Sequence, residues 1–143
     1  MKERSIPEPK AISPQFKKAL AQFPIPSVDD AISATPSTVE QWREYIQARN
    51  AEQKKKIKKM RKQFGVEVEL LNMAGVAVRK ITPKNVSEVF KDHIYIDVHG
   101  GAFVLFGGLP SIEEGILIAH RLGIKVLSVD YRMPPSSPAP SCT

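Results

Sequence analysis

The spacing of apolar residues changes from helical to alternating near residue 65, and this change divides the chain in two. From Val66 to Val78, apolar and polar positions alternate on both sides of the turn-forming run 72–75, which predicts an antiparallel pair of strands. Before that point the apolar residues recur at roughly helical spacing, which predicts an amphipathic helix carrying Trp42, Tyr45, Ile46, Ile57, Met60 and Phe64.

The second half of the chain carries two short apolar runs, residues 94–98 and 124–129, each typical of a buried strand. Between them Pro110 and the capping-box pattern of residues 111–114 open a helix that Gly123 ends. Two buried strands with a helix between them form a βαβ unit of a parallel sheet. The predicted fold class is therefore α/β.

The first 64 residues are predicted to be helical. Ser13-Pro14 suits an N-cap followed by proline, and residues 37–40 form a capping box at the start of the longer helix. Prolines at 24, 26 and 36 interrupt the chain between these helices. We expect one helical region at residues 1–64 and one α/β region at 65–143; the face of the first short helix holds Ile12, Phe16, Leu20 and Phe23.

The net charge of +6 is concentrated in residues 43–62, which hold nine Lys and Arg residues against two Glu. Such a run is either the solvated face of a helix or a patch for anionic lipid or nucleic acid. No aromatic residues are interleaved with the lysines of residues 54–62, and a nucleic-acid site usually needs them or a known fold. We favour the solvated face and expect no nucleic-acid partner.

The composition of the chain narrows the class of protein and the compartment in which we expect it. An apolar content of 42% and a charged content of 25% are ordinary values for a globular domain. The single cysteine, Cys142, excludes an internal disulfide. Residues 1–7 have no apolar signal segment, and no apolar run approaches the length of a membrane span. These patterns predict a cytoplasmic protein without a membrane span.

The strongest chemical signal follows the strand at 94–98, where the chain reads His99, Gly100, Gly101, Ala102 and Phe103. Glycine lacks a Cβ, so the backbone adopts strained dihedral angles there and a reacting carbonyl group can come close. Backbone N–H groups aimed at a developing negative charge are among the largest single contributions to acyl-transfer catalysis.

The HGGAF run resembles the HGGG-type oxyanion motif of lipases and esterases of the α/β-hydrolase fold. Residues 126–140 are similar to the strand and DYR-x-x-P segment of the hormone-sensitive-lipase-like carboxylesterases. The resemblance implies a partial α/β-hydrolase fold, with cap-like helices in residues 1–64 and the first part of the catalytic domain in 65–143.

The same resemblance implies a serine carboxylester hydrolase that acts on small acyl esters and uses no cofactor and no metal. It implies an oxyanion hole at Gly100, Gly101 and Ala102, in a loop that His99 shapes. It also gives the DYR residues a structural role beneath the site: Asp130, Tyr131 and Arg132. A metal site built from His93, Asp97 and His99 is only weakly indicated, because no further ligand is clustered with them.

The family's nucleophile lies in a G-x-S-x-G turn, and the acid and histidine of the triad follow it along the chain. These 143 residues contain no such turn, so we assign no catalytic triad residue. We interpret the sequence as a truncated N-terminal part of an esterase, inactive on its own. The alternative is a non-catalytic remnant or an interaction module.

The family's strand order predicts that the strand at 94–98 pairs with 124–129 on one side and with the absent nucleophile strand on the other. An unpaired apolar edge is a template for association between chains. We therefore expect self-association through an exposed edge that carries Ile94, Tyr95, Ile96 and Val98.

Overall fold

The computed structural model describes residues 11–22 and 26–137, and the chain divides after Thr35 into two compact units. The first unit contains helices α1 (Pro14–Leu20) and α2 (Val28–Ser33). The predicted cap of α1 is confirmed, because the Ser13 side chain accepts a hydrogen bond from the Phe16 N–H at 3.2 Å. Phe23 and Pro24, named in the sequence analysis, lie outside the described residues.

Helix α2 was not predicted. Ser27 caps it by accepting a hydrogen bond from the Asp30 N–H at 3.1 Å, and Asp29 and Asp30 place negative charge in its first turn. Both features stabilise a helix start. The prolines at 24 and 26 had suggested only turns, although a proline before a helix start is compatible with the helix that follows.

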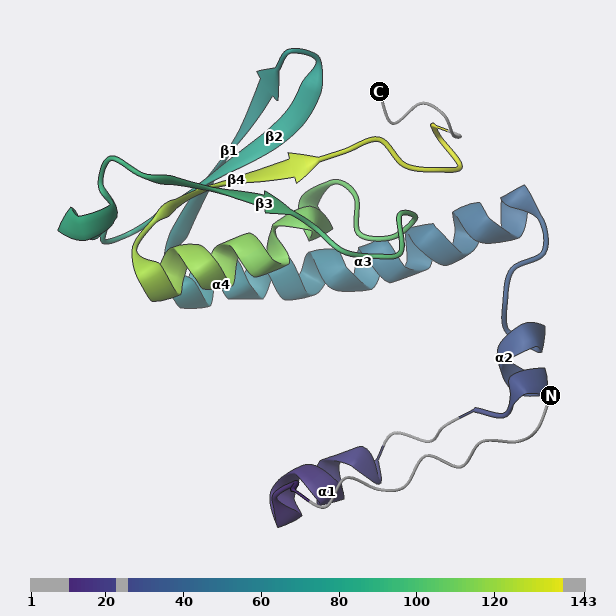
Figure 1. Cartoon of the computed structure of the whole chain (residues 1–143). Helices are drawn as coiled ribbons and strands as arrows, with labels where there is room; N and C mark the ends of the chain where they lie inside the picture. Colours follow the sequence, from purple (N-terminus) through teal and green to yellow (C-terminus); the bar gives the residue numbers. More distant parts are fainter. Residues whose placement is uncertain (1–10, 23–25, 138–143) are drawn as a thin grey trace. The chain divides into compact units, whose positions relative to one another are not determined.

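The second unit is a four-stranded sheet with helices. Its elements along the chain are α3 (Val39–Phe64), β1 (Val66–Met73), β2 (Val76–Pro83), the short 3₁₀ helix η1 (Glu88–Phe90), β3 (Ile94–Val98), the 3₁₀ helix η2 (Leu109–Ile112), α4 (Glu113–Leu122) and β4 (Lys125–Asp130). The strand order is β1-β2-β4-β3 (Figure 1). Strands β1 and β2 are antiparallel, and β3 and β4 are parallel with α4 between them. The predicted strand pair and βαβ unit are confirmed.

The β1–β2 hairpin closes with a two-residue turn. Met73 pairs with Val76, so only Ala74 and Gly75 lie between the strands, both with positive φ. Such turns match the twist of the strands they join. The Asn72 side chain accepts a hydrogen bond from the Gly75 N–H at 2.9 Å and fixes the turn.

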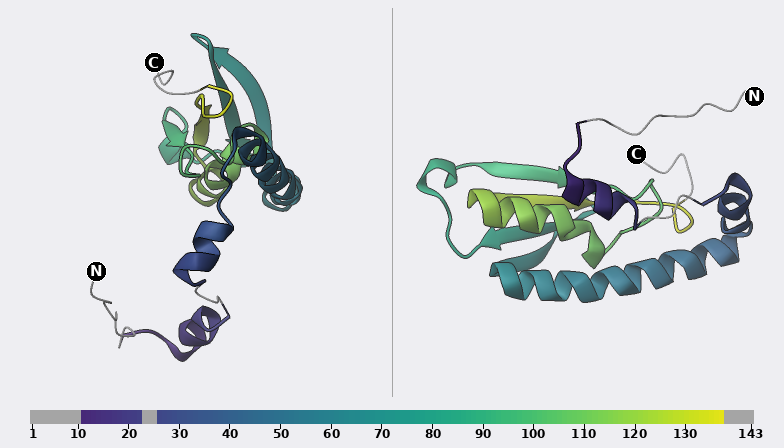
Figure 2. Two further views of the ribbon diagram at one scale, coloured as in Figure 1. Left: turned by 90° about the vertical axis from the view of Figure 1, so that its right-hand side faces the viewer. Right: turned by 90° about the horizontal axis from the view of Figure 1, so that it is seen from below.

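Helices α3 and α4 both cover the same face of this sheet, as the views in Figures 1 and 2 show. The core lies between them and the sheet and is aliphatic; its completely buried apolar members include Ile57, Ile81, Ile112, Ile116 and Val126. The sequence predicted Ile57 and Met60 on the apolar stripe of α3, and both are buried. Burial of this apolar area is the main stabilising contribution to the unit.

Strand β3 is an edge strand, and it carries apolar side chains on the face of the sheet opposite the helices. The register pairs Ile96 with Leu127 and Val98 with Val129, so these side chains share that opposite face. Ile94, Ile96 and Val98 are 58%, 66% and 63% exposed, and Tyr95 is also exposed. The predicted exposed apolar edge is confirmed.

Both predicted capping boxes are misplaced. The N-cap of α3 is Thr38, which accepts a hydrogen bond from the Gln41 N–H, while the Gln41 side chain accepts from the Thr38 N–H. The box therefore lies one residue beyond residues 37–40, because Gln41 serves as well as Glu40 and Thr38 keeps the extended backbone that a cap needs.

The predicted cap at Ser111 is wrong. The 3₁₀ helix η2 begins earlier, at Leu109, so Ser111 lies within a helical turn and its N–H donates to the Gly108 carbonyl at 3.2 Å. A residue with helical backbone cannot act as an N-cap.

Within residues 11–22 and 26–137, no helix is long and apolar enough to cross a bilayer.

Candidate functional site

The loop after β3 concentrates left-handed backbone. Gly101 has φ 122°, and Ala102, Phe103 and Phe106 have φ of 52°, 61° and 71°. Only four non-glycine residues in the described part of the chain have positive φ, and three of them lie in this loop. Backbone strain of this kind persists where the surroundings enforce it, and it clusters at functional sites.

A compact turn shapes the loop and frees two donors. The N–H groups of Val104 and Leu105 both donate to the Gly101 carbonyl, at 3.1 and 2.8 Å. No acceptor among the described residues takes a hydrogen bond from the N–H of Gly101 or Ala102. Free N–H groups at adjacent positions of a strained turn can bind an oxyanion.

At position 101 this turn accepts only glycine. A Cβ at this position would lie 2.3 Å from the backbone oxygen of Leu105. Ala102 takes the third glycine position of the resembling motif. Its φ of 52° is a left-handed value that alanine can adopt, whereas position 101 needs glycine. The motif HGGAF therefore keeps glycine at the position that closes the turn.

His99 supports the loop. The residue is 6% exposed, and its ring stacks on Tyr131 with ring centroids 4.5 Å apart. Nδ1 lies 2.7 Å from the Gly100 carbonyl, and because a carbonyl only accepts, Nδ1 carries the proton. The Tyr131 hydroxyl donates to the His99 carbonyl at 2.8 Å. His99 and Tyr131 thus hold the start of the loop from both sides.

Asp130 holds the far end of the same loop. One carboxylate oxygen accepts a hydrogen bond from the Gly108 N–H at 2.9 Å, and the other lies 2.6 Å from an Arg79 guanidinium nitrogen. Both side chains of the ion pair are largely buried, and the pair connects the loop to β2. The third residue of the DYR segment, Arg132, is exposed.

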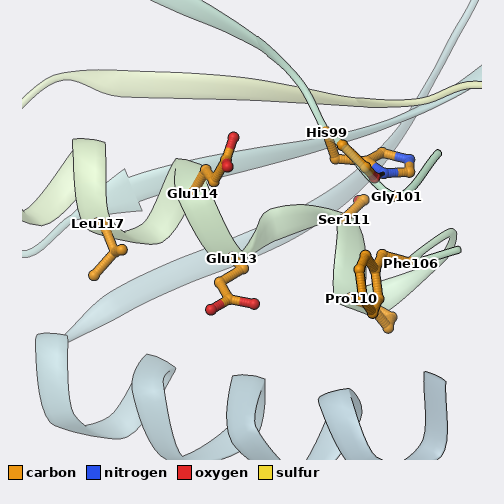
Figure 3. Close-up of a pocket in the computed structure, with 9 residues that line it drawn as sticks. His99, Gly101, Phe106, Pro110, Ser111, Glu113, Glu114 and Leu117 are labelled. Carbon is orange, nitrogen blue, oxygen red and sulfur yellow. Dashed lines mark hydrogen bonds between the residues drawn. The ribbon is translucent and has the colours of Figure 1, made fainter. Parts of the chain in front are cut away.

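A cavity of about 400 Å³ lies beside the loop, between it and the start of α4 (Figure 3). His99, Gly101 and Ser111 line one part, and Glu113, Glu114 and Leu117 line the part along α4. In the described part of the chain, His99 Nε2 and Ser111 Oγ are buried and have no hydrogen-bond partner. Buried polar atoms normally have one, so this cavity offers unmet hydrogen-bonding capacity to a ligand or a covering segment.

Asp97 is a buried carboxylate next to this cavity, 5% exposed on the helix-covered face of β3. Burial raises the pKa of Asp97, and the nearby Glu114 raises it further. A hydrogen bond with Ser128 and the electrostatic interaction with His99 both act to lower this pKa. From the sequence alone, Asp97 is indicated only as a possible metal ligand. No group of three potential ligands occurs among the residues that the structure describes.

Asp97 could have been found from the sequence by another signal. It is the single charged residue in the otherwise uncharged strand run 94–98. A carboxylate at an inward position of such a strand is expected to have a shifted pKa.

Two comparisons identify the family of this site. A family model described as an alpha/beta hydrolase fold matches residues 95–143, which include the loop and the DYR segment. The crystal structure of an esterase named E25 is 34% identical over 99% of this chain, with a TM-score of 0.81. The chain belongs to the α/β-hydrolase family. The resemblance predicted from its two motifs is confirmed.

This α/β-hydrolase chain spans 43% of the length of esterase E25. Esterase LipW from Mycobacterium marinum is 24% identical, covers 73% of this chain and 34% of its own, and has a TM-score of 0.58. An esterase/lipase from an uncultured bacterium is 19% identical, covers 92% and 40%, and has a TM-score of 0.53. These two share the fold. No curated protein matches the chain at a significant level.

Proposed function

We propose that this chain forms the oxyanion-binding part of a serine carboxylester hydrolase of the hormone-sensitive-lipase-like type. The observation that carries the proposal is the strained turn at Gly101 and Ala102, whose two N–H groups are free among the described residues and lie in the loop that borders a cavity. In such an enzyme the carbonyl oxygen of the ester gains negative charge when the nucleophile attacks, and these N–H groups stabilise it.

The nucleophile and base of this reaction come from outside these 143 residues, which contain no G-x-S-x-G turn. Within the described part, we assign His99 the role of positioning the loop, through its Nδ1 contact with the Gly100 carbonyl and its stacking on Tyr131. Asp130 and Tyr131 act through the loop as positioning residues. The substrates are small acyl esters.

The chain alone is expected to lack esterase activity, and a completed domain is expected to have it. The test compares the purified chain with a hybrid in which the part of esterase E25 that this chain does not cover is joined after residue 143. We expect the hybrid, and not the chain, to hydrolyse short-chain nitrophenyl esters. Turnover by the chain alone, with sensitivity to a serine-directed organophosphate, would contradict the assignment.

A second candidate function is supported by the exposed edge of β3. We infer that the chain on its own associates with copies of itself through this edge, which would make it an interaction module instead of a catalyst. The supporting observation is the exposed apolar row of Ile94, Ile96 and Val98 on an edge strand. Light scattering on the purified chain tests it, with a monodisperse monomer as the contrary outcome.

A further inference from the structure

The positive charge of helix α3 is concentrated near its C-terminal end. Residues 53–64 contain seven Lys and Arg residues, and no acidic residue occurs between Glu52 and Glu67. Of these seven cations, only Lys56 forms an ion pair within the described part of the chain, with Glu113 of α4. The other six form what we call the cationic face: Lys54, Lys55, Lys58, Lys59, Arg61 and Lys62.

The cationic face points away from the core. At about 3.6 residues per turn, its six positions share one half of the helix circumference, and the buried Ile57 and Met60 lie on the other half. All five lysines are exposed and Arg61 is half-buried. The sheet and α4 lie on the core side of α3 (Figure 1). From its first to its last residue the cationic face extends about 12 Å along the helix.

Helix stability does not account for the cationic face. Positive charge is favourable at a helix C-terminus, but this effect is confined to the last turn, which holds Arg61 and Lys62. The other four lysines lie three or four residues from other members of the face. Like charges at that spacing destabilise a helix. An anionic surface bound to the face would relieve this repulsion.

Three members of the cationic face line a hollow at the end of the helix. The hollow has a volume of about 390 Å³, and its lining residues are Lys58, Arg61, Lys62 and Val66. Arg61 Nε is buried and has no hydrogen-bond partner among the residues that the structure describes. Guanidinium groups form strong hydrogen bonds with phosphate oxygens. The hollow therefore suits a group that carries a phosphate.

Nucleic acid matches the cationic face less well than a lipid surface does. Residues 53–63 contain no aromatic side chain on which a base could stack, and five of the six cations are lysines. Lysine acts as a point charge, whereas the bidentate recognition typical of nucleic-acid sites uses arginine. A row of exposed lysines matches the diffuse negative charge of anionic lipid headgroups.

We propose that the cationic face docks the chain on a membrane that contains anionic phospholipid, with a headgroup phosphate in the hollow at Arg61. Each Lys or Arg near such a surface strengthens binding about fivefold, the factor that corresponds to about 1 kcal/mol. The attraction acts through solvent, so salt weakens it. The proposal concerns one side of α3 and does not depend on the proposed esterase activity.

Flotation of the full chain with lipid vesicles tests the proposal, because vesicle-bound protein rises and aggregated protein sinks. One set of vesicles contains phosphatidylcholine alone, and the other contains one-third phosphatidylserine. We expect binding to the second set only, and its loss between about 0.1 and about 0.5 M NaCl. Equal binding to both sets, binding that salt does not weaken, or no binding to either set would overturn the proposal.

Paired variants then locate the binding. Lys58→Gln/Lys62→Gln removes two charges beside the hollow and keeps a good helix former at each position. We expect it to bind phosphatidylserine vesicles about 25-fold more weakly. The matched control Lys18→Gln/Lys91→Gln removes the same charge from exposed positions outside α3, and its binding should be unchanged. Equal weakening by both variants would show that only net charge matters, and would refute the site.

Two further measurements complete the test. Lys58→Arg/Lys62→Arg keeps both charges and should bind as tightly as the unsubstituted chain, so a loss equal to that of the glutamine variant would contradict an electrostatic origin. Circular dichroism checks the folding of each variant, and Lys54→Gln/Lys55→Gln replaces the glutamine variant if that variant loses its helix. Double-stranded DNA added at equal phosphate concentration should not displace the chain from the vesicles. Displacement would assign the cationic face to nucleic acid and refute the proposal.

Discussion

Gly101 is the residue on which the oxyanion turn depends. Any side chain there would place its Cβ 2.3 Å from the Leu105 carbonyl oxygen, in a backbone conformation that L-residues rarely adopt. We expect Gly101→Val to lower kcat of the E25 hybrid by about 10²- to 10³-fold, the loss typical of one missing oxyanion donor. Steady-state kinetics with a nitrophenyl ester measure it.

His99→Ala is the companion variant for the same assay. It removes the stacking on Tyr131 and one contact to the Gly100 carbonyl, and it leaves the Gly101 and Ala102 N–H groups in place. A smaller loss of kcat than for Gly101→Val is expected. The assigned roles would be reversed if His99→Ala abolished activity and Gly101→Val preserved it.

Asp97 makes folding depend on pH. Burial raises its pKa above the ordinary value of 3.8, so the folded state holds this proton to higher pH than the unfolded state does. The contribution of Asp97 to stability is therefore greatest below pH 3.8 and falls as pH rises through the raised folded value. In Asp97→Asn this fall is absent.

Urea unfolding of the chain and of Asp97→Asn between pH 3 and 8 checks this prediction. The free energy of unfolding of the variant, relative to the unsubstituted chain, should increase with pH across that window. Glu114 and His99, the charged or titratable groups that act on Asp97, are present in both proteins, so the comparison isolates the change at residue 97. A difference that is constant with pH would show that Asp97 is not protonated more readily in the folded state.

At the scale of elements, one side chain connects helix α3 to the loop after β3. Asn50→Ala removes the acceptor of the Phe106 N–H and leaves that half-buried donor unpaired. We expect a loss of about 1 kcal/mol in the free energy of unfolding, measured with urea. Gln47→Ala, an exposed position on the same helix, is the control and should cause no loss. Equal effects would show that the hydrogen bond contributes nothing.

At the scale of the whole molecule, the face of the sheet away from α3 and α4 is apolar and exposed along β3. Ile96→Lys adds charge to the middle of this edge strand, a device that opposes pairing between edges. We expect it to lower the mass measured by light scattering and to reduce binding of a hydrophobic dye. Leu70→Lys, equally exposed at 66% on the other edge strand β1, is the matched control and should have a smaller effect.

The sequence by itself determined the elements whose cause is local. The alternation after Val66 predicted the hairpin, the apolar run 94–98 predicted β3, and Gly123 predicted the end of α4. Each of these features depends only on residues that are close together in the sequence, because the strand period, the helix period and a left-handed cap are local properties. The HGGAF motif likewise predicted the loop and the family. The starts of helices were predicted less accurately. For α3 the sequence offers two adjacent capping pairs, Ser37 with Glu40 and Thr38 with Gln41, and the helix uses the second.

Only the tertiary structure decided which residues meet. It brought Asn50 to Phe106 and Asp130 to Arg79, pairs separated by more than fifty positions in the chain, and no local pattern encodes such contacts. It also buried Asp97 beneath α4 and divided the stripe of α3 into a core half and a cavity half around Trp42. The reason is physical: periodicity specifies which face of an element is apolar, whereas packing between elements specifies what that face covers.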